Sequence, residues 1–190
     1  MHGLTVALSE ADLTLKLYRQ MGHLESKART QHNSGQPEWY TPANIIAAAV
    51  AVMGAIDLDP ASCATANEVV GAEKIFTVED DGIRQKWKGR VWLNPPYARG
   101  VIDQFCGILL HFYRGGDVTE ACVLVNNSTD SAWWQALAEQ ADAICHIRGR
   151  VPFWSPTGTG NPLQGSTVFY LGPNASLFRE QFASLGYSHL

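Results

Sequence analysis

The chain has 190 residues, of which 46% are hydrophobic and 17% are charged, and its formal net charge is −4. This length and composition are typical of one soluble domain with a substantial core, and no apolar run is long enough to cross a bilayer. The negative charge counts against a nucleic-acid partner, although basic residues cluster at residues 86–90 and 148–150. The four cysteines form no Cys-x-x-Cys pair, so we expect reduced thiols in a cytoplasmic protein and no metal site.

Residues 1–36 are predicted to form an accessory helix followed by a polar linker. Ser9 is a suitable N-cap for the helix. Its apolar positions recur at helical spacing and are Leu13, Leu17, Met21 and Leu24. Two interpretations of this apolar face are open, packing on the domain or contact with a second copy. We therefore expect a monomer or a weak homodimer.

A strongly apolar helix is predicted over Ile45–Met53, ending at Gly54. Thr41 can cap this helix, with Pro42 at its first position, where proline is tolerated. The N–H groups and partial positive charge of a helix N-terminus suit a carboxylate. Spacing alone, however, favours an ordinary capped helix with core aromatics.

The first central strand is predicted from an alternation of apolar and acidic residues that ends at a proline, Ile56-Asp57-Leu58-Asp59-Pro60. This strand places the Asp59 carboxylate at a carboxyl end, where open α/β sheets bind ligands. Only about 20 residues separate it from the Asp-Asp-Gly turn at 80–82, too few for complete βαβ units of about 30 residues each. We therefore expect a trimmed sheet with one short strand, Lys74–Thr77, in this interval.

A short buried strand over Val91–Leu93 stops at two consecutive prolines. Neither proline can donate to a sheet ladder, and Pro95 restricts Asn94 to extended or turn conformations. The Asn94 side chain and the Pro95 carbonyl thus present acceptors beyond the strand end, as an exocyclic amine requires. Tyr97 can stack on a planar ring. The same residues are also compatible with a strand-ending turn and a packed tyrosine.

The elements predicted after this motif are a helix over Val101–Leu109, a buried strand over Ala121–Val125, a helix with Trp133, Trp134 and Leu137 that Asp130 can cap, strands over Ala143–Ile147 and Thr167–Leu171, and a closing helix or tail over Phe178–Leu185. Asn126 and Asn127 follow the buried strand, on the rim expected for Asn94. The segment Arg148–Ser166 is too long for a hairpin turn. Within it, Arg150 and Gln164 suit guanine and adenine edges, and a disordered connector is the alternative.

The run Asn94-Pro95-Pro96-Tyr97 resembles the catalytic motif of amino-methyltransferases that use S-adenosylmethionine. The chain after about residue 37 resembles the phage-type DNA N6-adenine methyltransferases, the Dam-like family of phages and prophages. The matching blocks stand in the same order and are Glu38–Pro42, Ile56–Ser62, Glu79–Gly82, Trp87–Tyr97, Leu124–Asp130 and Gly149–Arg150. The ordered set is far more specific than the four-residue motif alone.

The resemblance implies a Rossmann-like class I S-adenosylmethionine-dependent methyltransferase fold over residues 37–190, with a trimmed sheet and an antiparallel final strand. It implies transfer of a methyl group from S-adenosyl-L-methionine to N6 of a flipped-out adenine in double-stranded DNA. The chain departs from related methyltransferases in having no glycine-rich turn after Pro60, since the next glycine is Gly71. The cofactor contacts of such a turn therefore do not transfer residue by residue.

The resemblance also assigns roles to residues. The implied catalytic residues are Asn94, Pro95, Pro96 and Tyr97. The implied cofactor-binding residues are Trp39, Tyr40, Thr41, Pro42, Asp57, Asp59, Pro60, Ala61, Ser62, Asp80 and Asp81. The implied substrate and DNA contacts are Arg99, Asn126, Asn127, Arg150 and Gln164.

Two alternatives stay open. An RNA base or a protein glutamine also presents a planar amine, so the motif is compatible with those substrates. The chain could instead be a non-catalytic DNA-binding relic of the family. The family suggests a phage or prophage product in the cytoplasm of a bacterial host, where it would protect DNA as in restriction-modification.

Overall fold

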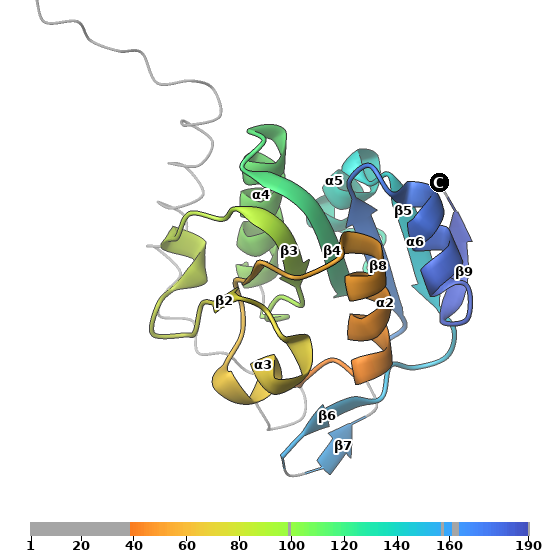
Figure 1. Cartoon of the computed structure of the whole chain (residues 1–190), viewed down its shortest axis with the longest axis horizontal. Helices are drawn as coiled ribbons and strands as arrows, with labels where there is room; N and C mark the ends of the chain where they lie inside the picture. Colours follow the sequence, from red (N-terminus) through yellow and green to blue (C-terminus); the bar gives the residue numbers. More distant parts are fainter. Residues whose placement is uncertain (1–38, 99, 157, 161–163, 190) are drawn as a thin grey trace, which may run out of the picture.

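The computed structural model describes residues 39–98, 100–156, 158–160 and 164–189. Within these residues the chain forms a mixed α/β fold with a sheet of seven strands and a separate two-stranded hairpin. The large sheet has the order β2-β1-β3-β4-β8-β5-β9 (Figure 1). In that order its strands are Lys74–Ile75, Leu58–Asp59, Gly89–Leu93, Val118–Asn126, Ser166–Leu171, Ala143–Ile147 and Gly186–His189.

The first four strands in the chain are parallel, and β8 lies antiparallel between β4 and β5. The carboxyl ends of β1, β3 and β4 therefore share one edge of the sheet with the amino end of β8. The prediction of an antiparallel strand over Thr167–Leu171 is confirmed, with β8 one residue longer. This strand is not the last one, because β9 follows it and pairs antiparallel with β5 at the sheet edge.

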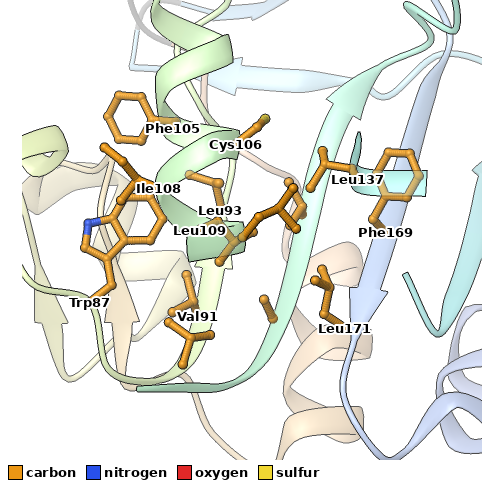
Figure 2. Packing of buried hydrophobic residues seen from close by; sticks show 14 of the residues in the cluster. Trp87, Val91, Leu93, Phe105, Cys106, Ile108, Leu109, Leu137, Phe169 and Leu171 are labelled. Atoms are coloured by element: carbon orange, nitrogen blue, oxygen red, sulfur yellow. The ribbon is translucent and has the colours of Figure 1, made fainter. Parts of the chain in front are cut away.

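Helices cover both faces of the sheet (Figure 1). The helices are α2 (Ala43–Met53), α3 (Ala64–Val70), α4 (Val101–Arg114), α5 (Ala132–Gln140) and α6 (Ala175–Phe182), with a short 3₁₀ turn, η1, at Gly82–Arg84. One apolar cluster lies between the sheet and α4 and α5, and a second lies between the sheet and α2 and α6. Figure 2 shows part of the first cluster, in which Trp87, Phe105 and Leu109 pack near the β3 residues Val91 and Leu93.

The central strand β4 shows why both faces need cover. Val123 and Val125 pack on the α4 side, and Cys122 and Leu124 pack on the α2 side. All four are fully buried, which confirms the predicted doubly buried strand. The thiol of Cys122 is in this core as a small apolar group, and burial raises its pKa well above the ordinary value.

Two capping predictions were wrong. Pro42, not Thr41, occupies the N-cap position of α2, because its backbone is extended, with ψ 144°. No side-chain cap bond forms there, since the proline ring has no oxygen to accept from a helix N–H. Ser131, not Asp130, precedes α5, and that helix also has no side-chain cap bond. The end of α2 at Gly54 was predicted correctly, with a φ of 80° that favours glycine.

The C-terminal part of the chain contains more structure than predicted. Within the long segment before β8, β6 (Phe153–Ser155) and β7 (Gly158–Gly160) form an antiparallel hairpin. The closing helix α6 begins at Ala175 and ends at Phe182, earlier at both ends than expected, with Phe178 and Phe182 as its buried positions. The predicted N-terminal helix and linker lie outside the described residues. In the part of the chain described here, no helix combines the length and apolar character that spanning a membrane requires.

Candidate active site

Polar side chains gather where three parallel strands end. Asp59 ends β1, Asn94 follows β3, and Asn126 ends β4. Ser166 begins the antiparallel β8 and pairs directly with Asn126. All four positions therefore lie along one edge of the sheet, which is where open α/β sheets bind their ligands.

The alternation of side chains puts this group on one face. Leu124 packs on the α2 side, so Asn126, two residues further along β4, points to the same side. Val168 packs there too, and Ser166 is two residues before it. Asn94 follows Leu93, which packs on the opposite, α4 side. Asn94, Asn126 and Ser166 therefore point to the face of the sheet that α2 covers. We call these three residues, with Asp59, the rim group.

The Asn94 amide has a defined orientation. Its Nδ2 donates to the main-chain carbonyl of Trp39 at 3.4 Å. Its Oδ1 accepts from the Tyr97 hydroxyl at 3.3 Å, and that hydroxyl also lies 3.3 Å from the carbonyl oxygen of Leu124. The amide nitrogen thus points to Trp39 and the amide oxygen to Tyr97. The oxygen has a second lone pair, which can accept one more hydrogen bond.

Tyr97 is more enclosed than a simple stacking platform. Its ring is half-buried and packs against the cluster under α4. Burial raises the pKa of the hydroxyl far above its ordinary value, so the group stays protonated and donates its hydrogen. Pro95 is buried and Pro96 is half-buried, so the motif is a stiff connection between β3 and the chain leading to α4.

The segment before α2 is held by the β6–β7 hairpin. Tyr40 and Trp154 exchange two main-chain hydrogen bonds of 2.8 and 3.1 Å, and the Trp154 indole donates to the Thr41 carbonyl at 3.1 Å. The Tyr40 hydroxyl accepts from the Cys63 thiol at 3.2 Å. Sequence reasoning missed Trp154 and Cys63 as neighbours of this segment, since no local pattern links positions so far apart.

Asp59 is a buried carboxylate, with only 3% of its surface exposed. Its Oδ1 accepts from the main-chain N–H of Ala61 at 3.1 Å. Loss of solvation raises the pKa of Asp59 from 3.8 to about 7, and the hydrogen bond from Ala61 opposes that shift. A buried carboxyl group near neutral pKa, at the end of a central strand, is typical of a binding site.

The two aspartates of the Asp-Asp-Gly turn are exposed and have local partners. Asp80 Oδ2 accepts from the N–H and the hydroxyl of Thr77, both at 2.8 Å, which lowers its pKa. Asp81 forms an ion pair with Arg84 at 2.9 Å. The turn packs tightly on the end of β1, because a Cβ on Gly82 would lie 2.1 Å from the carbonyl oxygen of Pro60. The structure therefore brings the turn beside the Asp59 region.

Asp57 is not part of the rim group. It precedes β1, and its Oδ2 accepts from the main chain and the Nε of Arg90 at 2.7 and 2.9 Å. The Arg90 Nη1 also donates to the Met53 carbonyl at 3.2 Å. This guanidinium lowers the pKa of Asp57. The ion pair joins the start of β1 to β3 and the end of α2, away from the edge where Asp59 lies.

A second polar group lies beside the rim. The Asn127 N–H donates to the Gly165 carbonyl at 2.9 Å, and its Oδ1 accepts from Thr167 at 2.6 Å. A Cβ on Gly165 would lie 2.8 Å from Asn127 Nδ2 and 3.3 Å from Arg150 Nη1, so both groups lie against this glycine. Gln164 is the adjacent residue and is exposed. Three predicted DNA contacts are thus neighbours, and a fourth, Arg99, lies outside the described residues.

A comparison with protein families shows which family the chain belongs to. A family model described as DNA N-6-adenine-methyltransferase (Dam) matches residues 27–171. The chain belongs to the Dam family. The match contains every candidate residue considered above, and it confirms the predicted enzyme class, DNA methylation at N6 of adenine. No curated protein matches the chain significantly.

Membership in the Dam family indicates which reaction the protein catalyses. DNA is the substrate of this family, and methyltransferases in general take their methyl group from S-adenosylmethionine. A Dam-family enzyme must place an adenine amine beside that donor. Asn94 and Asp59 lie at the ends of neighbouring parallel strands, and Asn94 contacts the Trp39 segment that precedes α2.

Proposed function

We propose that the protein is a Rossmann-like class I methyltransferase that binds S-adenosyl-L-methionine across the ends of β1 and β3. It methylates an adenine of double-stranded DNA whose amine is bound by Asn94. The observation that carries this proposal is the Asn94 amide itself. Its nitrogen donates to Trp39, and its oxygen is left as the acceptor. The methyltransferase domain is taken to span residues 37–190, with residues 1–36 as an accessory.

The residues around Asp59 fit the cofactor. S-adenosylmethionine carries an amine, a carboxylate and ribose hydroxyls, and when bound it supplies an electrophilic methyl group. The buried Asp59 carboxylate would accept from an amine or a hydroxyl, with Pro60, Ala61 and Ser62 shaping the turn beside it. The N-terminus of α2, reached through Trp39–Pro42, suits a carboxylate because its N–H groups carry partial positive charge.

Asp80 and Asp81 would flank the cofactor at the outer side of β1. Their turn packs on Pro60, which places their main chain close to the Asp59 site. The contacts with Thr77 and Arg84 both use the Oδ2 atom of the carboxylate, so the Oδ1 atom of either aspartate could accept from an adenine amine. We leave Asp57 out of the cofactor site, since its carboxylate is held by Arg90.

The chain's own residues would promote transfer by position and electrostatics. Asn94 Oδ1 and the Pro95 carbonyl would accept the two amine hydrogens of N6, which directs the nitrogen lone pair away from them. The same oxygens offset the positive charge that develops on nitrogen. Tyr97 orients Asn94 Oδ1 through its hydroxyl, and the exposed part of its ring would contact the base. Holding the amine in this geometry supplies most of the acceleration.

The polar group of Asn127, Arg150 and Gln164, with Arg99, would contact the DNA around the extruded base. Arginine and glutamine match guanine and adenine edges, so this group would contribute to the choice of target. We take the enzyme to act as a monomer or weak homodimer in the cytoplasm of a bacterial host. A phage or prophage origin would fit a protective role such as restriction-modification.

The test is the base composition of DNA from cells that express the protein. Mass spectrometry should find N6-methyladenine with the wild type and none with Asn94→Ala, while the variant still binds S-adenosylhomocysteine in calorimetry. RNA and a glutamine peptide serve as competing substrates in vitro. Methylation of either of these in place of DNA, or normal adenine methylation by Asn94→Ala, would overturn the proposal.

A further inference from the structure

Two buried polar atoms at the rim are left unsatisfied. Asn126 Oδ1 and Ser166 Oγ are both inaccessible to solvent, and neither has a hydrogen-bond partner among the described residues. Ser166 as a whole is fully buried. A buried polar atom without a partner costs about 1–3 kcal/mol, so two of them side by side require an explanation.

The two atoms are chemically complementary. Asn126 and Ser166 are direct partners in the antiparallel pairing of β4 and β8, so their side chains leave the same face of the sheet. One is an acceptor and the other can donate a hydroxyl hydrogen. A hydrogen bond from the Ser166 hydroxyl to Asn126 Oδ1 would satisfy both atoms. The Asn126 oxygen would then be held inward, with its Nδ2 toward the half-exposed outer side of the residue.

This orientation is the reverse of the one at Asn94. There the nitrogen is held by Trp39 and the oxygen receives donors. In the register of β3 and β4, Asn94 follows the Leu93–Val123 pair, so Asn126 lies one strand across and two residues further along. These steps are about 4.8 Å and about 6.6 Å, a separation that leaves room for the edge of a base between the two side chains.

We infer that Asn126 is a specificity residue that donates from Nδ2 to N1 of the target adenine, and that Ser166 is the positioning residue that orients it. This inference rests on the proposed function and deepens it. A flipped base is read on its Watson–Crick edge, and adenine shows a donor at N6 and an acceptor at N1. Asn94 and Asn126 present the matching acceptor and donor. Guanine presents the reverse pattern and would place like groups together at both contacts.

The experiment compares variants on duplexes that carry the methylated sequence identified from expressing cells. The target adenine is replaced by 1-deazaadenine, which lacks the N1 acceptor, or by 7-deazaadenine as the matched control. Asn126→Ala should lower kcat/KM at least tenfold on adenine and on 7-deazaadenine. On 1-deazaadenine the wild type should itself be slow, and the variant should differ from it by less than twofold. An equal loss on all three bases would overturn the contact with N1.

A double-mutant cycle tests the role of Ser166. Ser166→Ala should lower kcat/KM about fivefold to tenfold, and the double variant with Asn126→Ala should be no slower than Asn126→Ala alone. Additive losses would overturn the positioning role, and unchanged melting temperatures keep folding defects apart from it. If the wild type makes no N6-methyladenine on the natural duplex, the proposed function itself fails. If it methylates but shows no coupling to N1, only this inference fails.

Discussion

Asn94 Nδ2 donates to the main-chain carbonyl of Trp39 across 55 residues of sequence. This contact joins the end of β3, which carries the Asn-Pro-Pro-Tyr motif, to the segment that leads into α2. The segment is in turn held by Trp154 of the β6–β7 hairpin. The proposed positions for the amine and the methyl donor are therefore connected through one continuous set of hydrogen bonds.

The roles of the Tyr97 hydroxyl and of the Tyr97 ring can be tested separately with two substitutions. Tyr97→Phe removes the hydrogen bond to Asn94 Oδ1 and keeps the aromatic surface. We expect kcat to fall about tenfold, the effect of one hydrogen bond worth about 1.4 kcal/mol, with KM for DNA little changed. Tyr97→Ala should raise KM as well, because the contact between the ring and the base is also lost. Steady-state kinetics of both variants give the comparison, and equal kinetics for the two would contradict separate roles.

The raised pKa of Asp59 predicts that the stability of the fold depends on pH. Its pKa is raised from 3.8 to about 7 in the folded state, so between about pH 4 and pH 7 the folded chain holds a proton that the unfolded chain has lost. Its contribution therefore destabilises the fold as pH rises through that window, by no more than about 4 kcal/mol. Asp59→Asn should remove this slope in urea unfolding at pH 5, 6, 7 and 8. An unchanged slope would show that Asp59 is ionised in the fold.

The same variant tests cofactor binding. A ligand that donates to the Asp59 carboxylate favours its ionised form, so the wild type should bind S-adenosylhomocysteine more tightly at pH 8 than at pH 6. Asp59→Asn should bind it at least tenfold more weakly at pH 8, with little dependence on pH. Calorimetry at the two pH values measures both effects. Wild-type affinity that does not change with pH would speak against a direct contact.

The Asp57–Arg90 pair is expected to matter for folding and not for chemistry. Arg90→Ala removes a pair that is partly exposed and a bond to the Met53 carbonyl, so unfolding free energy should fall by roughly 1–2 kcal/mol. Cofactor affinity per folded molecule should stay within twofold of the wild type. Chemical denaturation and calorimetry separate the two quantities. A selective loss of cofactor binding would return Asp57 to the site.

Gly82 is predicted to be intolerant of even one added methyl group. A Cβ at this position would lie 2.1 Å from the Pro60 carbonyl oxygen, a backbone atom that cannot move without shifting the Asp59 turn. Gly82→Ala should therefore cost about 2 kcal/mol or more of stability and weaken cofactor binding. Gly115→Ala is the matched control, since neither glycine has a positive φ and a Cβ on Gly115 would meet no atom nearer than 3.4 Å. Equal effects of the two substitutions would contradict a clash with the Pro60 carbonyl.

Local pattern predicted many of the elements because their causes are local. The continuous apolar run of β4 and the Gly54 end of α2 follow from burial on both faces and from a positive φ. The strand β9 escaped prediction, since Gly186–His189 has no alternating apolar pattern and its pairing with β5 supplies the order. The hairpin β6–β7 was missed for a similar reason, as its contacts with Tyr40 lie more than a hundred residues away in sequence.

The residue types and their order were enough to predict the family and the motif chemistry, because the two prolines have no N–H to donate, so the Pro95 carbonyl and the Asn94 side-chain oxygen are acceptors at a strand end. Which carboxylates lie together was decided by the tertiary structure. Asp57 and Asp59 differ by two residues in one acidic alternation, yet one pairs with Arg90 and the other is buried at the rim. The orientation of the Asn94 amide likewise depends on Trp39 and Tyr97, because a side-chain amide has no preferred polarity until its neighbours impose one.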